Sequence, residues 1–132
     1  MRHMYLEVYL ESKWIVEIGG EFDPEFNHLH EDVRTEILAL SRLLQRFGPQ
    51  LGRPRADTLY GSRQANMKEL RFSAADSEWR VAFAFDPTRK AILLAAGNKS
   101  GVSEKRFYKR FVAKADKRFQ AHLDRLQAEK GK

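Results

Sequence analysis

Alternation of apolar and polar positions predicts β-strands in the second half of the chain. The stretches concerned are KELRFS (68–73), EWRVAFAFD (78–86) and AILLAAGNK (91–99). In the second stretch the bulky residues fall on one side, and the other side carries Arg80 among alanines. Asp86-Pro87 begins a turn between the second and third strands. Near the start, KWIVEI (13–18) predicts a first strand.

Two helices are predicted between the first strand and the later ones. Asp23-Pro24 is a helix start, since Asp caps free amides and Pro is tolerated in the first turn, and we expect a short helix over Pro24–Leu29. A second helix from about Glu31 follows from apolar residues at spacings of three and four, ending at Gly48-Pro49. We expect the two helices to form a hairpin packed on the sheet.

A third, longer helix is predicted from Ser103, which is a possible cap. Its apolar stripe comprises Phe107, Phe111, Ala115, Phe119, Leu123 and Leu126. Lysines and arginines occupy much of the remaining circumference, which makes the helix basic and amphipathic. Helices of this kind can lie on a membrane surface, but docking on the protein's own domain with the cations in water is the favoured interpretation. We expect no membrane partner.

Residues 48–66 are predicted to be an irregular connection, because they contain three Gly, two Pro and three Arg. One short extended piece is expected near Thr58–Tyr60. A basic loop is a plausible contact for an anionic ligand, and Arg63 is the candidate RNA contact within it.

Length and composition favour a single domain over residues 1–132, in which residues 1–12 are a possible extension. The absence of cysteine excludes disulfides and thiolate metal sites. No run of eighteen apolar residues is present and acidic residues follow soon after the start, so we expect neither a membrane helix nor a secretory signal. The expected location is therefore the cytoplasm.

The net charge of +6 is distributed unevenly. Residues 1–50 sum to about −4, residues 51–98 to about +3 and residues 99–132 to about +7. An acidic first third and a basic remainder predict two faces with different partners, one of which attracts polyanions.

Charged residues on the predicted strands define the candidate site. They are Lys68, Glu69, Arg71, Arg80 and Lys99. The neighbouring strand positions hold Ala82, Ala84, Ala95 and Gly97. Small residues beside fixed cations predict an open, positive surface on the sheet, which suits a phosphate backbone because Arg and Lys pair with phosphate oxygens.

This set of residues suits RNA cleavage without a metal. That reaction needs a base for the ribose 2′-hydroxyl, cations for the charge on the phosphorane and a proton donor for the leaving 5′-oxygen. Glu69 is the candidate base, while Arg71 and Arg80 would hold the scissile phosphate. Lys68 or Lys99 would protonate the leaving group. Alternatively, Glu69 and Arg71 form only a salt pair on an exposed sheet face.

The histidines add no metal chemistry to this site. His28 and His30 would coordinate a metal only with further ligands from elsewhere, and no histidine accompanies the basic strands. No glycine-rich phosphate loop and no hydrolase triad signature is found. We therefore expect neither a metal nor a cofactor.

Three segments in succession resemble the phage-derived, HigB-like branch of the RelE toxin superfamily. They are FGPQLGRPRADTLYGSRQANMKELRF, EWRVAFAFDPTRKAILLAAGNKSG and EKRFYKRFVAKADKRFQAHL, within a resemblance that spans about residues 14–126. It implies an α+β, RelE-like fold with two N-terminal helices on an antiparallel sheet of about four to five strands, and a C-terminal helix. It also implies a type II toxin, usually a ribosome-dependent mRNA endonuclease, with a helix-turn-helix (HigA-like) antitoxin as partner.

The resemblance also bears on individual residues. The family's strand lysine and arginines fall on Lys68, Arg71 and Arg80, and its loop cation falls on Lys99. Glu69 as base and Arg63 as RNA contact rest on chemistry more than on kinship. The expected RNA contacts on the last helix are Lys105, Arg106 and Lys109.

Two questions stay open at the level of sequence. The tyrosine or histidine that several relatives use after the final strand has no counterpart in GNKSG, which leaves Tyr108 as a distant candidate for the general acid. The alternative function is a non-catalytic phage or host module that binds RNA, the ribosome or another protein through the same sheet.

Overall fold

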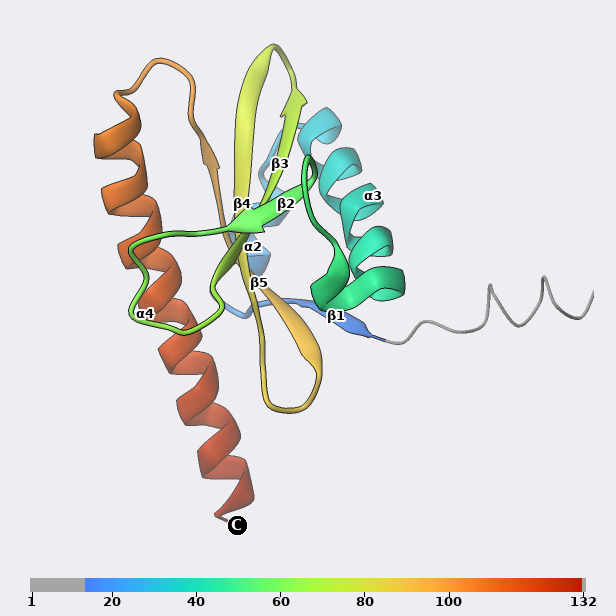
Figure 1. Ribbon diagram of the computed structural model, residues 1–132, viewed down its shortest axis with the longest axis vertical. Coiled ribbons are helices and arrows are strands. Elements are labelled where there is room, and N and C mark those ends of the chain that lie inside the picture. Colours follow the sequence, from blue (N-terminus) through green and yellow to red (C-terminus); the bar gives the residue numbers. More distant parts are fainter. Residues whose placement is uncertain (1–13, 132) are drawn as a thin grey trace, which may run out of the picture.

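A five-stranded sheet with helices on both faces forms the molecule (Figure 1). The computed structural model describes residues 14–131. The strands are β1 (Ile15–Ile18), β2 (Ala56–Thr58), β3 (Lys68–Ala74), β4 (Ser77–Phe85) and β5 (Lys90–Asn98). The helices are α2 (Asp23–Asn27), α3 (Glu31–Phe47), the 3-10 turn η1 (Gly48–Gln50) and α4 (Glu104–Lys130). The expected α+β class, with two N-terminal helices and a C-terminal one, is confirmed.

The strand order is β1-β5-β4-β3-β2, and β1 pairs with β5 in parallel. The expectation of a purely antiparallel sheet was therefore wrong. Parallel neighbours need a long crossover, and the chain between β1 and β5 supplies one because it contains both N-terminal helices and three strands. The other neighbouring pairs are antiparallel, as alternation and the turn residues predict.

One core lies between α3 and its face of the sheet. The buried side chains of α3 are Val33, Ile37, Leu40, Ser41 and Leu44. They pack with large residues from the strands, among them Leu70, Val81, Phe83 and Leu93. The helix begins and ends where spacing and the Gly48-Pro49 stop predict.

The second core lies under α4, on the side of the sheet with small residues. Ala82, Ala84 and Ala95 are buried there with the aromatic stripe of α4. A Cβ atom at Gly97 would lie 2.7 Å from the ring of Phe107, so only glycine lets this ring approach β5 so closely. The predicted open surface is thus covered over these positions, because the small residues make room for helix α4.

Side-chain contacts fix the C-terminal half of α4. Arg118 pairs with Glu25 through two hydrogen bonds of 2.8 and 2.6 Å and also donates to the carbonyl of Leu94. Arg125 pairs with Glu21 at 3.1 Å, and His122 contacts the buried carboxylate of Asp86 at 2.8 Å. These contacts attach α4 to α2, to the residues that precede α2 and to the β4–β5 turn.

Asp86 joins the β4–β5 turn to α4. Its Oδ1 accepts from the amide and hydroxyl of Thr88 and from the amide of Lys90, while Oδ2 faces His122. Burial acts to raise the pKa of Asp86, but the hydrogen bonds from His122, Thr88 and Lys90 outweigh it, and the pKa is lowered from 3.8. The folded state therefore favours the charged carboxylate.

This shift predicts acid sensitivity of the α4 contact. A lowered folded-state pKa means that stability is present above the unfolded value and is lost as pH falls through the folded value. We expect Asp86→Asn to lower the free energy of unfolding at pH 7 by about 1–3 kcal/mol. The variant should also lose less stability than the wild type between about pH 5 and pH 2. Urea unfolding at several pH values measures both effects.

Glu36→Gln is the matched control, since Glu36 lies on the exposed side of α3. It should leave the acid profile unchanged. Glu21 and Glu25 also have lowered pKa values, each through the hydrogen bond from its arginine, so Asp86→Asn reduces the acid dependence without removing it. Identical profiles for the wild type and Asp86→Asn would show that Asp86 does not hold α4.

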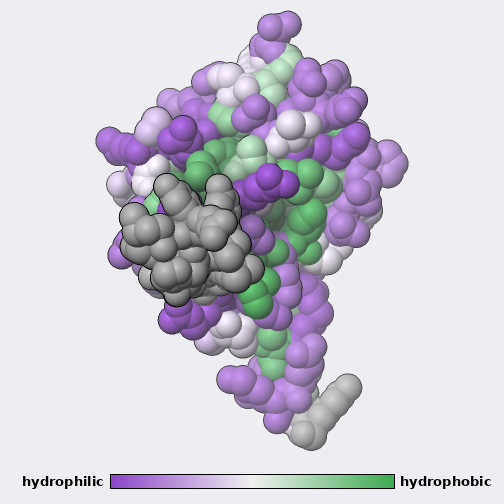
Figure 2. All heavy atoms as spheres, turned by 90° about the vertical axis from the view of Figure 1, so that its right-hand side faces the viewer, coloured by the Kyte–Doolittle hydropathy of each residue, from purple (hydrophilic) through white to green (hydrophobic). Residues whose placement is uncertain are grey.

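Figure 2 shows the side of the molecule on which α3 and β1 lie in Figure 1. Hydrophilic side chains cover most of its outline, and apolar ones gather nearer its middle. Ile15 of β1 and Leu38 and Phe47 of α3 are among the exposed large apolar residues. Within residues 14–131, none of the helices combines the length and the apolar character needed to cross a membrane.

Candidate functional site

Glu69 is the centre of a hydrogen-bonded group on the α4 side of the sheet. It lies on β3, opposite Ala82 of β4, and is only 1% exposed. Its Oε2 accepts from Nε of Arg71 at 2.9 Å, and its Oε1 accepts from the hydroxyl of Tyr108 at 2.9 Å. A buried carboxylate needs such donors, so Glu69 and its partners form one unit.

Arg71 connects this unit to solvent. Its side chain is 38% exposed and also lies 3.7 Å from the carboxylate of Asp57 on β2. Burial acts to lower the pKa of Arg71, but the hydrogen bond and charge of Glu69 outweigh it, and the pKa is raised. Arg71 is thus a fixed cation with one side free to meet an anion.

Tyr108 extends from the first turns of α4 toward the sheet. Its hydroxyl donates to Glu69 and accepts from Nε of Arg80 at 3.2 Å. The pKa of Tyr108 is raised, mainly by burial and further by the negative charge of Glu69, against a lowering effect of the hydrogen bond from Arg80. The phenol therefore stays protonated at neutral pH and links the carboxylate to the arginine.

Arg80 and Lys99 complete the group. Arg80 lies directly opposite Arg71 in the β3–β4 pair and is buried, and it also donates to its own strand at the carbonyl of Trp79. Lys99 follows β5 and pairs with Glu104 of α4 at 2.9 Å. The ammonium of Lys99 lies 6.0 Å from the centre of the Tyr108 ring, within reach of a cation–π contact.

The structure brings Glu69, Arg71, Arg80 and Lys99 together but not Lys68. Lys68 pairs with Phe83 across β3–β4, and this register puts it on the α3 face with Leu70. Of the expected RNA contacts, Arg63, Lys105 and Lys109 line a groove beside α4, while Arg106 lies in the exposed first turn of that helix.

The charges of the group are more balanced than the sequence analysis predicted. Arg71 pairs with Glu69 and Asp57, and Lys99 pairs with Glu104. Among the described residues, Arg80 has no carboxylate within 4.0 Å and relies on Tyr108 and a carbonyl. The surface is a set of paired charges with partly exposed cations, because β2, β3 and α4 each contribute a carboxylate.

The sequence analysis named Tyr108 only as a distant candidate and did not identify Asp57 or Glu104 as part of the site. A usable signal for Tyr108 was its place beside Phe107 in the aromatic run of α4, where it is the one residue of FYKRF that carries a hydroxyl on a ring. Among residues 14–131, no group of three or more His, Cys, Asp or Glu is placed to hold a metal ion.

Comparisons with known proteins identify the family of the chain. Residues 24–120 match the model of a family described as "Phage derived protein Gp49-like (DUF891)". A Mycobacterium tuberculosis (strain ATCC 25618 / H37Rv) protein described as "Putative toxin HigB2" is 44% identical over 107 residues, which cover 80% of this chain and 53% of that protein. The chain thus spans about half the length of HigB2.

A second protein of the same strain, described as "Putative toxin HigB3", is 43% identical over 93 residues, covering 70% of this chain and 79% of that protein. No solved structure gives a significant match. The family match includes every strand of the site and most of α4, so it covers the residues that make the hydrogen-bonded group. The chain therefore belongs to the phage-derived Gp49-like family and is HigB-like in sequence.

Proposed function

We propose that this protein is the toxin of a type II toxin–antitoxin pair and inhibits translation in the cytoplasm by cutting mRNA on the ribosome. The observation that supports the chemistry is the contact of one tyrosine hydroxyl with both a buried carboxylate and a buried arginine, Glu69 and Arg80. Exposed cations beside this hydroxyl provide places for phosphate oxygens. The reaction would need no metal.

The 2′-hydroxyl proton leaves through Tyr108. The carboxylate of Glu69 is buried and accepts from the hydroxyl of Tyr108, so the phenol can carry a proton between a substrate and Glu69. As the 2′-oxygen attacks phosphorus, its proton passes to the oxygen of Tyr108 while the phenol proton passes to Glu69. The concerted transfer avoids a free phenolate, which the raised pKa of Tyr108 disfavours.

The cations act on the phosphate and the leaving group. Arg71, half-exposed beside Glu69, would pair with the scissile phosphate and stabilise the charge that builds on it, while Arg80 holds the phenol in place. Lys99 would give a proton to the departing 5′-oxygen, which leaves a cyclic phosphate on one fragment and a 5′-hydroxyl on the other. Solvent then returns Glu69 and Lys99 to their starting states.

The proposed protein partner is a small helix-turn-helix antitoxin encoded beside the toxin. Both relatives are described as putative toxins, and the resemblance to HigB-like toxins implies such a partner. Growth arrest on expression, relieved by the neighbouring gene, would test this partner separately from the chemistry.

A second candidate function is a non-catalytic module that binds RNA, the ribosome or a protein. The pairing of site cations with Asp57, Glu69 and Glu104 favours it, because paired charges are common in structural surfaces. Cleavage and binding are therefore to be measured separately.

Arg71→Ala is the first test of the nuclease. We expect this variant to cut translated mRNA about 100- to 1,000-fold more slowly than the wild type, because one preorganised donor to the phosphorane is lost. Primer extension on mRNA in a translating extract measures the new ends. Lys90→Ala is the matched control, since Lys90 is also an ion-paired cation but lies on β5 beside Glu17 of β1.

If Arg71→Ala cuts mRNA at the full wild-type rate, Arg71 has no part in the mechanism. Ribosome association of the wild type with no new mRNA ends would replace the nuclease by the binding module.

A further inference from the structure

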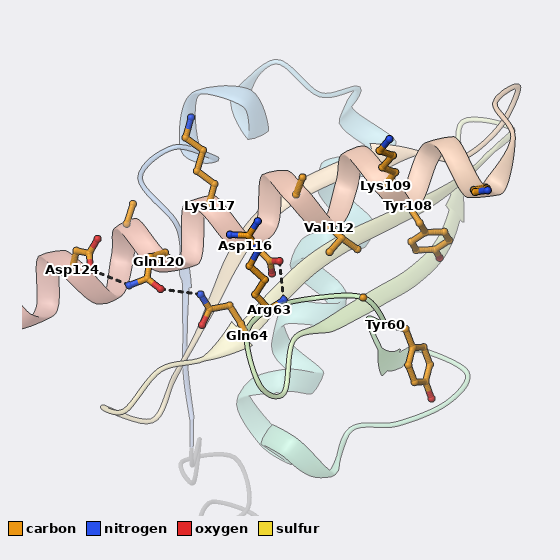
Figure 3. A pocket seen from close by; sticks show the side chains of 14 residues that line it. Tyr60, Arg63, Gln64, Tyr108, Lys109, Val112, Asp116, Lys117, Gln120 and Asp124 are labelled. Atoms are coloured by element: carbon orange, nitrogen blue, oxygen red, sulfur yellow. Dashed lines mark hydrogen bonds between the residues drawn. The ribbon is translucent and has the colours of Figure 1, made fainter.

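A groove of about 1080 Å³ runs between α4 and the loop that joins β2 to β3. The loop side is formed by residues 60–64, and the helix side extends from Lys105 to Asp124 (Figure 3). At about 1.5 Å of rise per residue, this stretch of helix is roughly 28 Å long. The groove is therefore long enough for an extended chain and too open to enclose a small molecule.

Hydrogen bonds between loop and helix shape the groove. The Ser62 hydroxyl and the backbone amide of Arg63 both donate to Asp116, the latter at 2.9 Å, and the side-chain amide of Gln64 donates to the side chain of Gln120 at 3.1 Å. These three contacts hold the loop along the helix, and those of Arg63 and Gln64 are drawn in Figure 3. The groove is consequently part of the folded structure and needs no ligand to form.

Tyr60 stands at one end of the groove with its ring in solvent. It is 76% exposed, the most exposed of the large apolar and aromatic side chains within the described part of the chain. Gly61 follows with a φ of +87°, a left-handed conformation that turns the chain sharply after Tyr60. An aromatic ring exposed in this way offers a flat face on which a nucleic-acid base can stack.

Tyr108 links the groove to the catalytic group. It lines the groove at the same end as Tyr60, and its hydroxyl lies between Glu69 and Arg80 (Figure 3). A chain that lies in the groove would thus pass directly to the proposed cleavage site.

The polar groups of the groove favour an anionic chain. Arg63, Lys105, Lys109 and Lys117 line it, against the two carboxylates of Asp116 and Asp124. Asp116 is already occupied by Ser62 and Arg63, and Asp124 accepts from Gln120. The cations therefore outnumber the acids, and both acids already have donors within the protein.

We propose that this groove binds single-stranded RNA next to the cleaved bond and that Tyr60 stacks on one of its bases. The inference builds on the nuclease proposed above and extends it to the flanking nucleotides. Stacking on an aromatic ring accepts any base, and lysines along the helix would follow the phosphates. The role of Tyr60 is to position the strand, while Tyr108 takes part in the chemistry.

Binding can be measured apart from cleavage with a fluorescently labelled 2′-O-methyl RNA oligomer, because this probe lacks the attacking hydroxyl. In fluorescence anisotropy with the full chain, Tyr60→Ala should weaken binding about five- to 150-fold, and Tyr60→Phe should bind as the wild type does. Lys109→Ala should reduce the logarithmic salt slope by about 0.7. Phe47→Ala is the control, since Phe47 is an exposed aromatic residue of α3, on the other face of the sheet.

The results separate this inference from the nuclease. Binding that depends on Tyr60 in a protein that cuts no mRNA would support the groove and overturn only the nuclease. Normal cleavage with equal probe affinity for Tyr60→Ala and the wild type would overturn only the groove. Loss of antitoxin binding by Tyr60→Ala with unchanged RNA affinity would also overturn it, in favour of a protein site.

Discussion

Tyr108→Phe is expected to cut translated mRNA at least about 100-fold more slowly than the wild type, the effect of losing one acid–base group. The substitution removes a single oxygen and keeps the ring that packs against Phe107 and Phe111. That oxygen is the only route from the substrate to Glu69 in the proposed relay. Single-turnover primer extension with saturating ribosomes measures the rate.

The fold should survive this change. Loss of the hydroxyl leaves one oxygen of Glu69 without its shortest donor, and we expect a loss of about 1–3 kcal/mol in the free energy of unfolding. Affinity for the 2′-O-methyl probe should stay within a factor of about two, because stacking and lysine contacts remain. Wild-type cleavage by Tyr108→Phe would eliminate the relay and return the search for the base to other residues.

Glu69→Ala is expected to lower the free energy of unfolding by about 3 kcal/mol, near the lower end for breaking a buried charge pair. The carboxylate lies among Arg71, Tyr108 and, behind the phenol, Arg80, so its removal leaves buried donors without an acceptor. The expected loss in the free energy of unfolding is at the lower end of that range because Arg71 is half-exposed and its guanidinium can be hydrated by solvent. Urea unfolding followed by circular dichroism measures the loss.

Glu69→Gln is the matched comparison for the chemistry. The amide oxygen of the glutamine can still accept a hydrogen bond from Tyr108, so this variant should be more stable than Glu69→Ala. The amide cannot take up the proton, so Glu69→Gln should cut mRNA no faster than Glu69→Ala does. Glu36→Ala, on the exposed side of α3, controls for the loss of an acidic residue. A stable Glu69→Gln variant with normal cleavage would make Glu69 a positioning residue alone.

Local patterns in the sequence predicted most of the elements. Period-two alternation found β3 and β4, and spacings of three and four found α3 and the buried stripe of α4. Ser103 caps α4 as expected, accepting from the amide of Arg106. These signals are local because hydrogen bonding and burial repeat within a few residues.

Long-range packing determines which face of the sheet is covered, and local patterns in the sequence do not reveal this. Alternation correctly put Glu69, Arg71 and Arg80 on one face, but the same pattern fits a face open to ligand and a face covered by a helix. The space beside Gly97 is filled by the ring of Phe107 from α4, and the alternation within β5 contains no sign of this contact. Tyr108 reached Glu69 for the same reason, since the two are 39 positions apart in the chain.

The charges of the proposed cleavage site are nearly balanced, which has a consequence for selectivity. Any phosphate that reaches Arg71 or Lys99 must compete with a carboxylate already in contact, Glu69 or Glu104. When a phosphate binds, each cation exchanges a carboxylate for the phosphate, and the net gain in Coulomb energy is small. A polyanion that meets the site without other contacts, such as duplex DNA, therefore gains little binding energy there. Only a strand already aligned by other contacts would displace the carboxylates, so the site would bind weakly to nucleic acids that the protein meets at random.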